Sequence, residues 1–235
     1  TVFQPVVDLR THDLLGHEAL SRGPAGSPLE LPRAMFRASA EAGISPDLDR
    51  ACRENALGAI RSLATPGKVF VNVLPHGLAD DEAQQMELLE ALHDVALAPE
   101  DLVLEFSERG AQRDPDDFAA CLGRLKARGF GIALDDIGTG YVSQPVIEEV
   151  RPDYLKLDAS LVRGIEDNMI KQELIASLIR ISARIGSSVI GEGIETLLEA
   201  QTLIDAGAQF GQGHLFSAPA PAGTIVVAPH PGQEH

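Results

Sequence analysis

The chain has 235 residues, 44% of them hydrophobic, so it can bury one large core, and a barrel of this length needs no division into two domains. Its 35 Asp and Glu residues outnumber its 19 Lys and Arg residues, which gives a formal net charge of −16. Such a surface repels nucleic-acid polymers and anionic membranes, which are therefore excluded as partners of the domain. A phosphate ligand would need cations, or a few placed basic side chains, to offset this field.

The cysteines and the apolar runs indicate the cellular compartment in which the domain works. Cys52 and Cys121 fall in segments that read as helices, and they lack the spacing of a disulfide framework or a zinc site, which favours a reducing cytoplasm. No apolar run approaches the roughly 20 residues that span a bilayer, and no signal peptide is visible. Because the chain opens at Thr1 directly into a strand-like run, we expect a piece of a longer protein, with any sensor or membrane anchor outside it.

Apolar runs rich in Val, Ile and Phe alternate with stretches of helical periodicity, which is the pattern of repeated βα units. Strands are predicted near Val2–Val7, Leu15–Leu20, Val69–Leu74, Leu102–Phe106, Gly131–Leu134, Tyr154–Leu157, Ser188–Ile190 and Phe210–Gly211. Helices are predicted near Leu29–Ala42, Asp47–Leu63, Glu82–Val95, Pro115–Ala127, Ser160–Ile185 and Leu197–Ala206.

The connections between these elements predict the fold class. Residues 8–14, which separate the first two strands, are too few for a helical crossover, so these strands must pair antiparallel, whereas every later strand is expected to follow a helix. This predicts an α/β fold, a TIM-like (β/α)8 barrel in which the first strand is antiparallel. The barrel is expected to span residues 1–217, and residues 218–235, with their Pro and Gly content, are expected to be loosely held.

Polar side chains end several strands that should otherwise be wholly apolar. All fall at C-terminal strand ends, the rim where barrel enzymes assemble their active sites. The residues are Glu18, Asn72, Glu105, Asp135, Asp136, Lys156, Glu192 and Gln212.

Each of these residues also has a structural interpretation when taken alone. Glu18 or Glu105 could cap a helix or pair with a surface Arg, and the adjacent acids at 135 and 136 could simply form a turn. Lys156 could belong to a buried structural ion pair, while Asn72 and Gln212 could satisfy loop backbone. Together they are harder to explain in this way, because carboxylates that converge on one rim repel one another unless cations bind among them.

The residue types select the cation. Carboxylate and amide oxygens without clustered His or Cys suit hard cations such as Mg²⁺ or Mn²⁺, and they argue against zinc or copper. The adjacent acids Asp135 and Asp136 allow one carboxylate to bridge two ions while the next binds the second ion. Two ions about 3.5–4 Å apart are a standard arrangement for in-line attack on a phosphodiester, so phosphoryl transfer is the leading reaction class.

The ordered motifs resemble one known family, that of the EAL phosphodiesterases. His17–Arg22 (HEALSR) looks like its signature followed by an arginine, and residues 3–7 (FQPVV) resemble its first strand. The other matching blocks are residues 71–72 (VN), 104–108 (LEFSE), 135–141 (DDIGTGY), 155–158 (LKLD), 191–196 (GEGIET) and 212–216 (QGHLF). The resemblance covers essentially the whole chain, and the seven ordered motifs from His17 to Phe216 are far more specific than a bare Glu-Ala-Leu, which is common by chance.

The resemblance implies a hydrolase that opens cyclic di-GMP to linear pGpG with Mg²⁺ or Mn²⁺. By position, Glu18, Asn72, Glu105 and Asp135 would hold one metal, and Asp135, Asp136 and Glu192 would surround the other. Lys156 would orient or polarise the attacking water, with Glu192 acting as base or chiefly as a ligand, and Gln212 would contact a metal-bound water. Arg22 and Gln4 would meet the substrate, and Glu108 would brace the loop from Ile137 to Gln144.

The resemblance also implies a homodimer within a larger signalling protein. The chain departs from the family pattern at Ile137, Val142 and Gln144, where Phe, Ser and Leu are usual, and at His214, where Tyr is usual. His214 is interpreted as a spacer or, alternatively, as a substrate contact. Two alternatives to hydrolysis stay open: a catalytically weak cyclic di-GMP receptor that signals to a partner, and an unrelated metal-dependent barrel.

Overall fold

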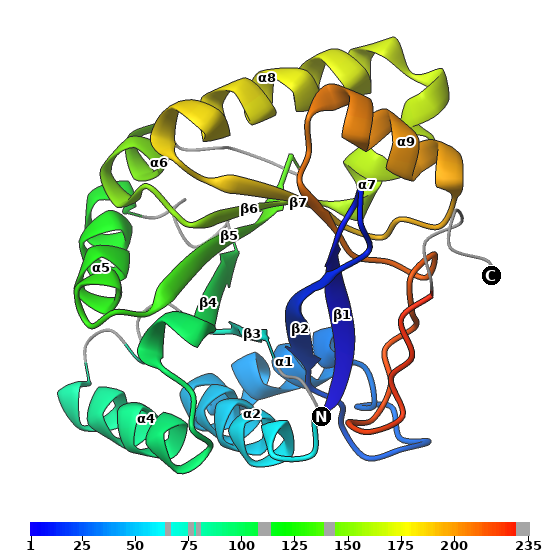
Figure 1. The fold of residues 1–235 in the computed structure, drawn as a ribbon. Helices are drawn as coiled ribbons and strands as arrows, with labels where there is room; N and C mark the ends of the chain where they lie inside the picture. The colour runs from blue at the N-terminus through cyan, green and yellow to red at the C-terminus, as the bar shows by residue number, and fades with distance from the viewer. Residues whose placement is uncertain (64–66, 75–77, 79–80, 108–113, 139–143, 229–235) are drawn as a thin grey trace.

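Eight strands close into a single barrel, with helices packed around its outside (Figure 1). The structure is a computed structural model that describes residues 1–63, 67–74, 78, 81–107, 114–138 and 144–228, with only the backbone at 144–146. The strands are β1 (Val2–Asp8), β2 (Leu14–Leu20), β3 (Lys68–Asn72), β4 (Leu102–Ser107), β5 (Gly131–Ile137), β6 (Tyr154–Leu157), β7 (Ser188–Gly191) and β8 (Phe210–Gly211).

Strand direction confirms the predicted fold class. β1 pairs antiparallel with both β2 and β8, and all the other neighbouring strands pair in parallel. The C-terminal ends of β2 to β8 therefore share one rim, and the N-terminal end of β1 joins them there. This explains why Gln4, near the start of the chain, lies directly opposite Glu18 on β2.

The helices of the described residues surround the strands in chain order (Figure 1). Short polar residues and glycines set several of their ends; for example, the side chain of Asp81 accepts a hydrogen bond from the N–H of Gln84 at the start of α4. The α-helices are α1 (Pro32–Ala42), α2 (Ser45–Ile60), α4 (Glu82–Asp94), α5 (Pro115–Ala127), α6 (Gln144–Val150), α7 (Ala159–Val162), α8 (Met169–Ile185) and α9 (Leu197–Ala206). Two short 3-10 helices are η1 (Pro99–Asp101) and η3 (Ile165–Asp167).

The prediction of one continuous helix over Ser160–Ile185 is wrong. The chain there forms α7, η3 and α8, because Gly164 takes a left-handed conformation with φ of 65° and Asn168 starts a new helix. The Asn168 side chain accepts hydrogen bonds from the N–H groups of Ile170 and Lys171, each at 3.1 Å.

Helix α6 was not predicted from the sequence. It has seven residues, and among its described side chains the apolar ones of Ile147 and Val150 are buried. Two apolar positions are too few to show helical periodicity in the sequence. The structure therefore supplies the helix that the barrel pattern requires between β5 and β6.

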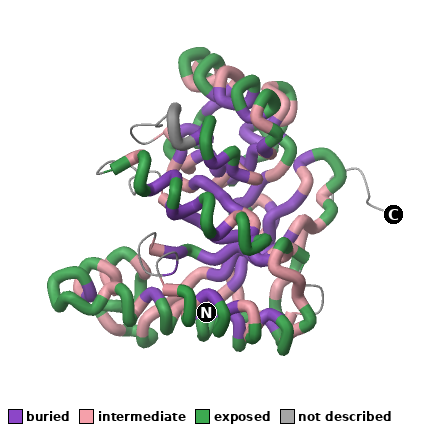
Figure 2. Tube along the Cα trace, turned by 90° about the vertical axis from the view of Figure 1, so that its left-hand side faces the viewer, coloured by how far each residue is buried: buried purple, intermediate pink, exposed green. Residues whose placement is uncertain are grey.

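The core lies on both sides of the strands. Outward-facing apolar residues pack against the helices in one large cluster, while Val6, Phe70, Val103, Ala133 and Ile190 form a smaller cluster with partly buried neighbours. These five residues come from five different strands, as expected for an interior layer of a barrel. Figure 2 shows the buried residues along the central strands and the exposed ones on the outer faces of the helices.

The segment after β8 returns alongside β1. Phe3 and Ala220 form a bridge with two backbone hydrogen bonds of 2.7 and 2.9 Å, and Ile225 and Val227 pack partly buried against the core. Looser order of residues 218–235 stays a prediction, since 229–235 lie outside the described residues. No helix in the described part of the chain is long and apolar enough to cross a membrane.

Candidate active site

Strand periodicity places the polar residues at the barrel mouth. Side chains two residues apart on a strand point to the same face. Phe70 lies in the interior cluster and is followed two residues later by Asn72, and Val103 is followed in the same way by Glu105. The same spacing relates Ala133 to Asp135, Tyr154 to Lys156, Ile190 to Glu192 and Phe210 to Gln212. An apolar layer thus closes the barrel below, and a polar layer lies above it at the rim.

Lys156 lies at the centre of the polar layer, and its side chain is fully buried. Its Nζ is 2.6 Å from Glu105 Oε1, 2.8 Å from Glu192 Oε1, 3.3 Å from Glu18 Oε2 and 3.9 Å from Asp135 Oδ1. The Glu105 side chain is also fully buried, whereas those of Asp135 and Glu192 are 17% and 19% exposed. The cluster therefore has a closed floor and an acidic mouth that opens to solvent.

Two amide side chains hold the carboxylates in place. Asn72 Nδ2 donates hydrogen bonds of 3.1 Å to both Glu18 Oε1 and Glu105 Oε2. Gln212 Nε2 donates to Glu18 Oε2 at 2.7 Å and to Gln4 Oε1 at 3.1 Å. Strands β1, β2, β3, β4 and β8 are thereby linked through one continuous network.

The adjacent acids on β5 depend on an irregularity in the strand. The register between β5 and β6 shifts between Leu134 and Ile137, and Asp136 has a positive φ of 61°, a conformation that Asp tolerates better than most residues. Asp136 N–H donates to Asp135 Oδ1 at 2.8 Å, and Ser107 Oγ donates to Asp136 Oδ2 at 2.8 Å. Both carboxylates are thus fixed at the mouth.

Burial and mutual repulsion shift the pKa values of the cluster. Burial alone lowers the pKa of Lys156, but the fields of Asp135, Glu105, Glu18 and Glu192 together raise it well above its ordinary value. Burial, reinforced by the charge of Glu18, raises the pKa of Glu105 well above its usual range. Lys156 is therefore charged, and Glu105 resists ionisation.

The other three carboxylates differ among themselves. Burial raises the pKa of Glu18, but Lys156 and the amide donors outweigh it, so this pKa is lowered. Burial raises the pKa of Asp135, and it raises the pKa of Glu192 well above its usual value, against the opposing charge of Lys156. One ammonium thus faces four carboxyl groups, and burial and mutual repulsion oppose the ionisation of three of them unless further positive charge is present.

The donor set fits hard divalent cations. Lys156 Nζ, Glu105 Oε1 and Gln212 Oε1 are buried without an aligned hydrogen-bond partner among the described residues. Carboxylate oxygens dominate the cluster, and a half-turn of the Asn72 amide would direct an oxygen to the point where Nδ2 now lies. Within the described part of the chain, no three Asp, Glu, His or Cys side chains are already arranged to hold a metal ion, and the Nζ of Lys156 lies among the carboxylates.

A cavity of about 310 Å³ adjoins the cluster. Glu18, Asn72 and Arg33 are among its polar lining residues, and Leu20 and Phe36 contribute to its apolar wall. A cavity of similar size, about 320 Å³, lies between α2 and α4, but it is bordered by surface ion pairs such as Arg50–Glu87 and does not include the cluster. Only the first of these two cavities can hold part of a ligand whose phosphate meets the carboxylates.

The remaining predicted site residues are placed as follows. Gln4 and Gln212 join the cluster directly. Arg22 follows β2, where its side chain donates to Ser21 O at 2.9 Å, and it makes no ion pair with any described residue. Glu108 and most of the loop from Ile137 to Gln144 lie outside the described residues.

The sequence prediction omitted two residues that support the cluster. Ser107, which holds Asp136, follows Glu105 by two positions at the end of β4, so strand periodicity could have indicated it. Asp49 on α2 is 2% exposed, pairs with Arg53 and accepts a hydrogen bond from Leu74 N–H at 3.1 Å, just beyond Asn72. No sequence pattern relates Asp49 to β3.

The comparison with protein families decides the classification. Residues 1–219 match the family model described as EAL domain. The chain belongs to the EAL domain family. The motifs that carried the resemblance are therefore those of this family, and the barrel with its antiparallel first strand agrees with it.

Curated relatives of this EAL domain carry different names. It is 32% identical to an uncharacterized protein of Azorhizobium caulinodans, over 95% of this chain and 32% of that protein. It is 29% identical to the cyclic di-GMP phosphodiesterase PA2567 of Pseudomonas aeruginosa, over 93% of this chain and 38% of that protein. It is 26% identical to the blue light- and temperature-regulated antirepressor BluF of Escherichia coli, over 92% of this chain and 53% of that protein. The chain thus spans about a third to a half of these relatives.

Solved structures include close matches with ligands bound. BlrP1 of Klebsiella pneumoniae, in complex with calcium and cyclic di-GMP, superposes with a TM-score of 0.87 at 30% identity, over 96% of this chain and 57% of that one. A manganese and cyclic di-GMP complex of BlrP1 gives a TM-score of 0.84 at 31% identity, over 93% of this chain and 55% of that one.

Proposed function

We propose that this EAL domain hydrolyses cyclic di-GMP to linear pGpG and requires Mg²⁺ or Mn²⁺. The observation that carries the proposal is the convergence of four carboxylates on the buried ammonium of Lys156 at the barrel rim. The similarity to PA2567 and to the ligand-bound BlrP1 structures supports the choice of substrate.

The rim residues divide between two cation positions. One ion would be held by Glu18, Asn72, Glu105 and Asp135, and the other by Asp135, Asp136 and Glu192. When bound, these ions supply positive charge that lowers the pKa of water and stabilises charge on the phosphate. They would also offset the excess negative charge of the cluster, and so allow a net acidic domain to accept an anionic dinucleotide.

Lys156 and Glu192 are suited to orient the attacking water. Their charged atoms lie 2.8 Å apart at the mouth, and the raised pKa of Glu192 makes its carboxylate a stronger proton acceptor than an exposed one. A water molecule would give a proton to the carboxylate of Glu192 as its oxygen adds to phosphorus, while the bond from phosphorus to the 3′ oxygen breaks and that oxygen takes a proton. The ring opens in this step, and the product is a linear dinucleotide.

Substrate contacts come from the rim and the adjoining cavity. Arg22 makes no ion pair with the described residues, so its guanidinium can meet a phosphate, and Gln4 lies beside Gln212 at the cluster. The cavity beside Glu18 and Asn72 has the size and the apolar wall to take a planar ring. Glu108 is proposed to brace the loop that follows β5, and homodimerisation and membership of a larger signalling protein stay predictions.

The test is incubation of the purified chain with cyclic di-GMP and Mg²⁺ or Mn²⁺, followed by chromatography of the nucleotides. We expect pGpG to accumulate, and a chelator to stop its formation. Parallel reactions with Ca²⁺ show whether the chain can bind cyclic di-GMP without hydrolysing it.

A second candidate function is a receptor that binds cyclic di-GMP without hydrolysis and signals to a partner. The similarity to BluF supports this second candidate, because BluF is named as an antirepressor and not as a phosphodiesterase. Tight binding of cyclic di-GMP in Ca²⁺, with intact nucleotide after long incubation in Mg²⁺ and Mn²⁺, would select the receptor over the hydrolase.

A further inference from the structure

Glu199 on α9 is 2% exposed, and its side chain accepts hydrogen bonds from two separate segments of backbone. Oε2 accepts from the N–H groups of Glu195 and Thr196, at 2.8 and 3.1 Å. Oε1 accepts from the N–H of Gly164 at 3.0 Å. The first two amides follow Glu192 at the end of β7, and the third lies between α7 and η3, in the segment after β6. One carboxylate therefore joins the segments that leave two neighbouring strands.

Helix capping accounts for only part of this arrangement. Thr196 and Glu199 form a capping box at the start of α9, in which Glu199 N–H donates to Thr196 Oγ1 at 3.1 Å. A capping box needs the side chain of Glu199 to accept only from Thr196 N–H. The bonds from Glu195 and Gly164 are additional, and the second of them crosses to another segment.

The two segments also pack closely. Gly193, the residue after Glu192, has a φ of 64°, and a Cβ at this position would lie 2.5 Å from the Cβ of Ala159 in α7. Arg163 and Glu195 form an ion pair on the exposed side of the same junction, with side chains that are each 46% exposed. Exposed pairs contribute little, so the buried carboxylate is the stronger link.

We propose that Glu199 is a positioning residue, whose carboxylate holds the segment bearing Glu192 against the segment after β6 and thereby keeps Glu192 beside Lys156. Glu192 Oε1 lies 2.8 Å from Lys156 Nζ, and Glu192 N–H donates to Leu157 O at 3.1 Å. Burial raises the pKa of Glu199, but the amide donors outweigh it and lower the pKa, so the group is charged at neutral pH. The effect on rate rests on the proposed function.

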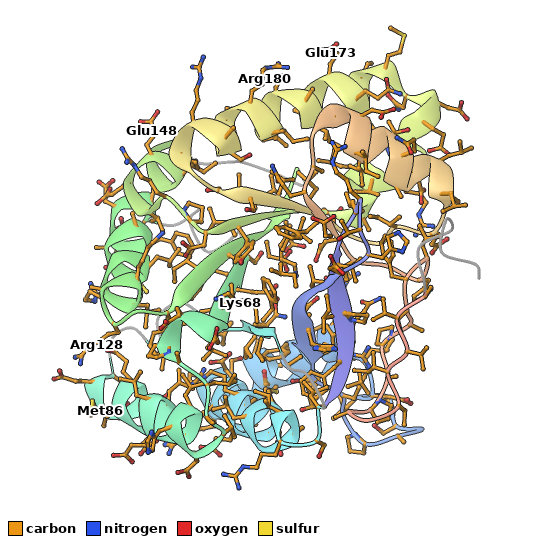
Figure 3. All side chains as sticks on the ribbon, in the orientation of Figure 1. Lys68, Met86, Arg128, Glu148, Glu173 and Arg180 are labelled. Carbon is orange, nitrogen blue, oxygen red and sulfur yellow. The ribbon has the colours of Figure 1, made fainter. Side chains whose placement is uncertain are left out.

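Glu199→Gln tests this role, because the amide keeps the shape of the side chain but loses the charge and one acceptor oxygen. Glu173→Gln is the matched control, since Glu173 points outward from α8, away from the rim (Figure 3). Both variants are measured for kcat and KM on cyclic di-GMP with Mn²⁺. Backbone hydrogen exchange is followed by mass spectrometry in residues 163–168 and 192–196 without metal or substrate.

For Glu199→Gln we expect exchange in both segments to become faster and kcat to fall roughly 10- to 100-fold, with KM changed less than about threefold. Glu173→Gln should match the wild type in every measurement. Glu199→Asp, which keeps the charge on a shorter side chain, should recover part of kcat and is the variant to measure if Glu199→Gln does not fold.

An unchanged exchange rate in Glu199→Gln, or an unchanged kcat with faster exchange, would overturn the positioning role. Absence of turnover in the wild type would contradict the proposed function, and exchange would still decide whether Glu199 holds the two segments.

Discussion

At the scale of single residues, the ammonium of Lys156 balances carboxylates that would otherwise repel one another. It lies within 4 Å of Glu18, Glu105, Asp135 and Glu192, and its side chain has no exposed surface. The desolvation penalty of a buried charge is offset by its oppositely charged partners, so the removal of one partner destabilises the fold.

Lys156→Met removes this charge while keeping the length of the side chain. We expect the free energy of unfolding without metal to fall by about 3–5 kcal/mol, because buried carboxylates lose their counter-ion. Added Mn²⁺ should raise the melting temperature more than in the wild type, since the cluster then has one positive charge fewer. Urea denaturation and thermal melting with and without Mn²⁺ measure both effects.

The matched control for this change is Lys68→Met. Lys68, which is labelled in Figure 3, begins β3, and Asn72 ends it. The Lys68 side chain is 30% exposed, and its Nζ pairs with Asp101 at 3.3 Å. Its loss should cost no more than about 1 kcal/mol. Equal losses in the two variants would show that Lys156 does not balance the cluster.

Glu18→Ala should abolish hydrolysis while the fold is retained. Glu18 is the carboxylate with a lowered pKa, held by Asn72 and Gln212, so it is charged and ready to bind a cation. We expect the rate to fall at least about 100-fold, with an unchanged circular dichroism spectrum. Glu173→Ala on the outer face of α8 is the control, and retained activity in Glu18→Ala would refute the proposed metal ligands.

The sequence indicated which polar side chains gather at the rim, but it did not indicate which residues support them. Glu105 and Lys156 stand out because a charged residue in an apolar strand is conspicuous. Ser107 and Asp49 are ordinary polar residues in the sequence, and their contacts with Asp136 and Leu74 depend on how strands and helices pack. The pairing of all four carboxylates with one lysine likewise needs the closed barrel.

At the scale of elements, the interior layer explains why the polar rim forms. Strands with an apolar residue two positions before a polar one place the first in the barrel interior and the second at the mouth. This period of two could be read from the sequence, as could the antiparallel start. The bulge at Asp136 and the break at Gly164 depend on single left-handed residues, which periodicity does not report.

Helix α2 is anchored to the end of β3 through Asp49. Its carboxylate pairs with buried Arg53 and accepts a hydrogen bond from Leu74 N–H. We expect Asp49→Asn to lower the free energy of unfolding by about 3–5 kcal/mol, because Arg53 would be left buried without its counter-ion.

Urea denaturation measures this loss, and Glu54→Gln on the same helix is the control. Glu54 pairs with Arg50, and its side chain is 63% exposed. Its substitution should change stability by no more than about 0.5 kcal/mol. A similar effect of the two variants would mean that the buried pair is not an anchor.

At the scale of the whole molecule, an acidic chain with a net charge of −16 gathers part of its negative charge at one rim. That rim faces the cavity of about 310 Å³ beside Glu18 and Asn72. Cations bound there would convert the most repulsive part of the surface into a phosphate site. The proposed activity therefore depends on metal for both binding and chemistry.

The most direct measurement is the conversion of cyclic di-GMP by the purified wild-type chain in Mn²⁺, with and without chelator, resolved by chromatography over time. The proposal predicts pGpG that appears steadily in Mn²⁺ and stops when the chelator is added. Cyclic di-GMP that remains intact in Mn²⁺ and in Mg²⁺ would contradict it.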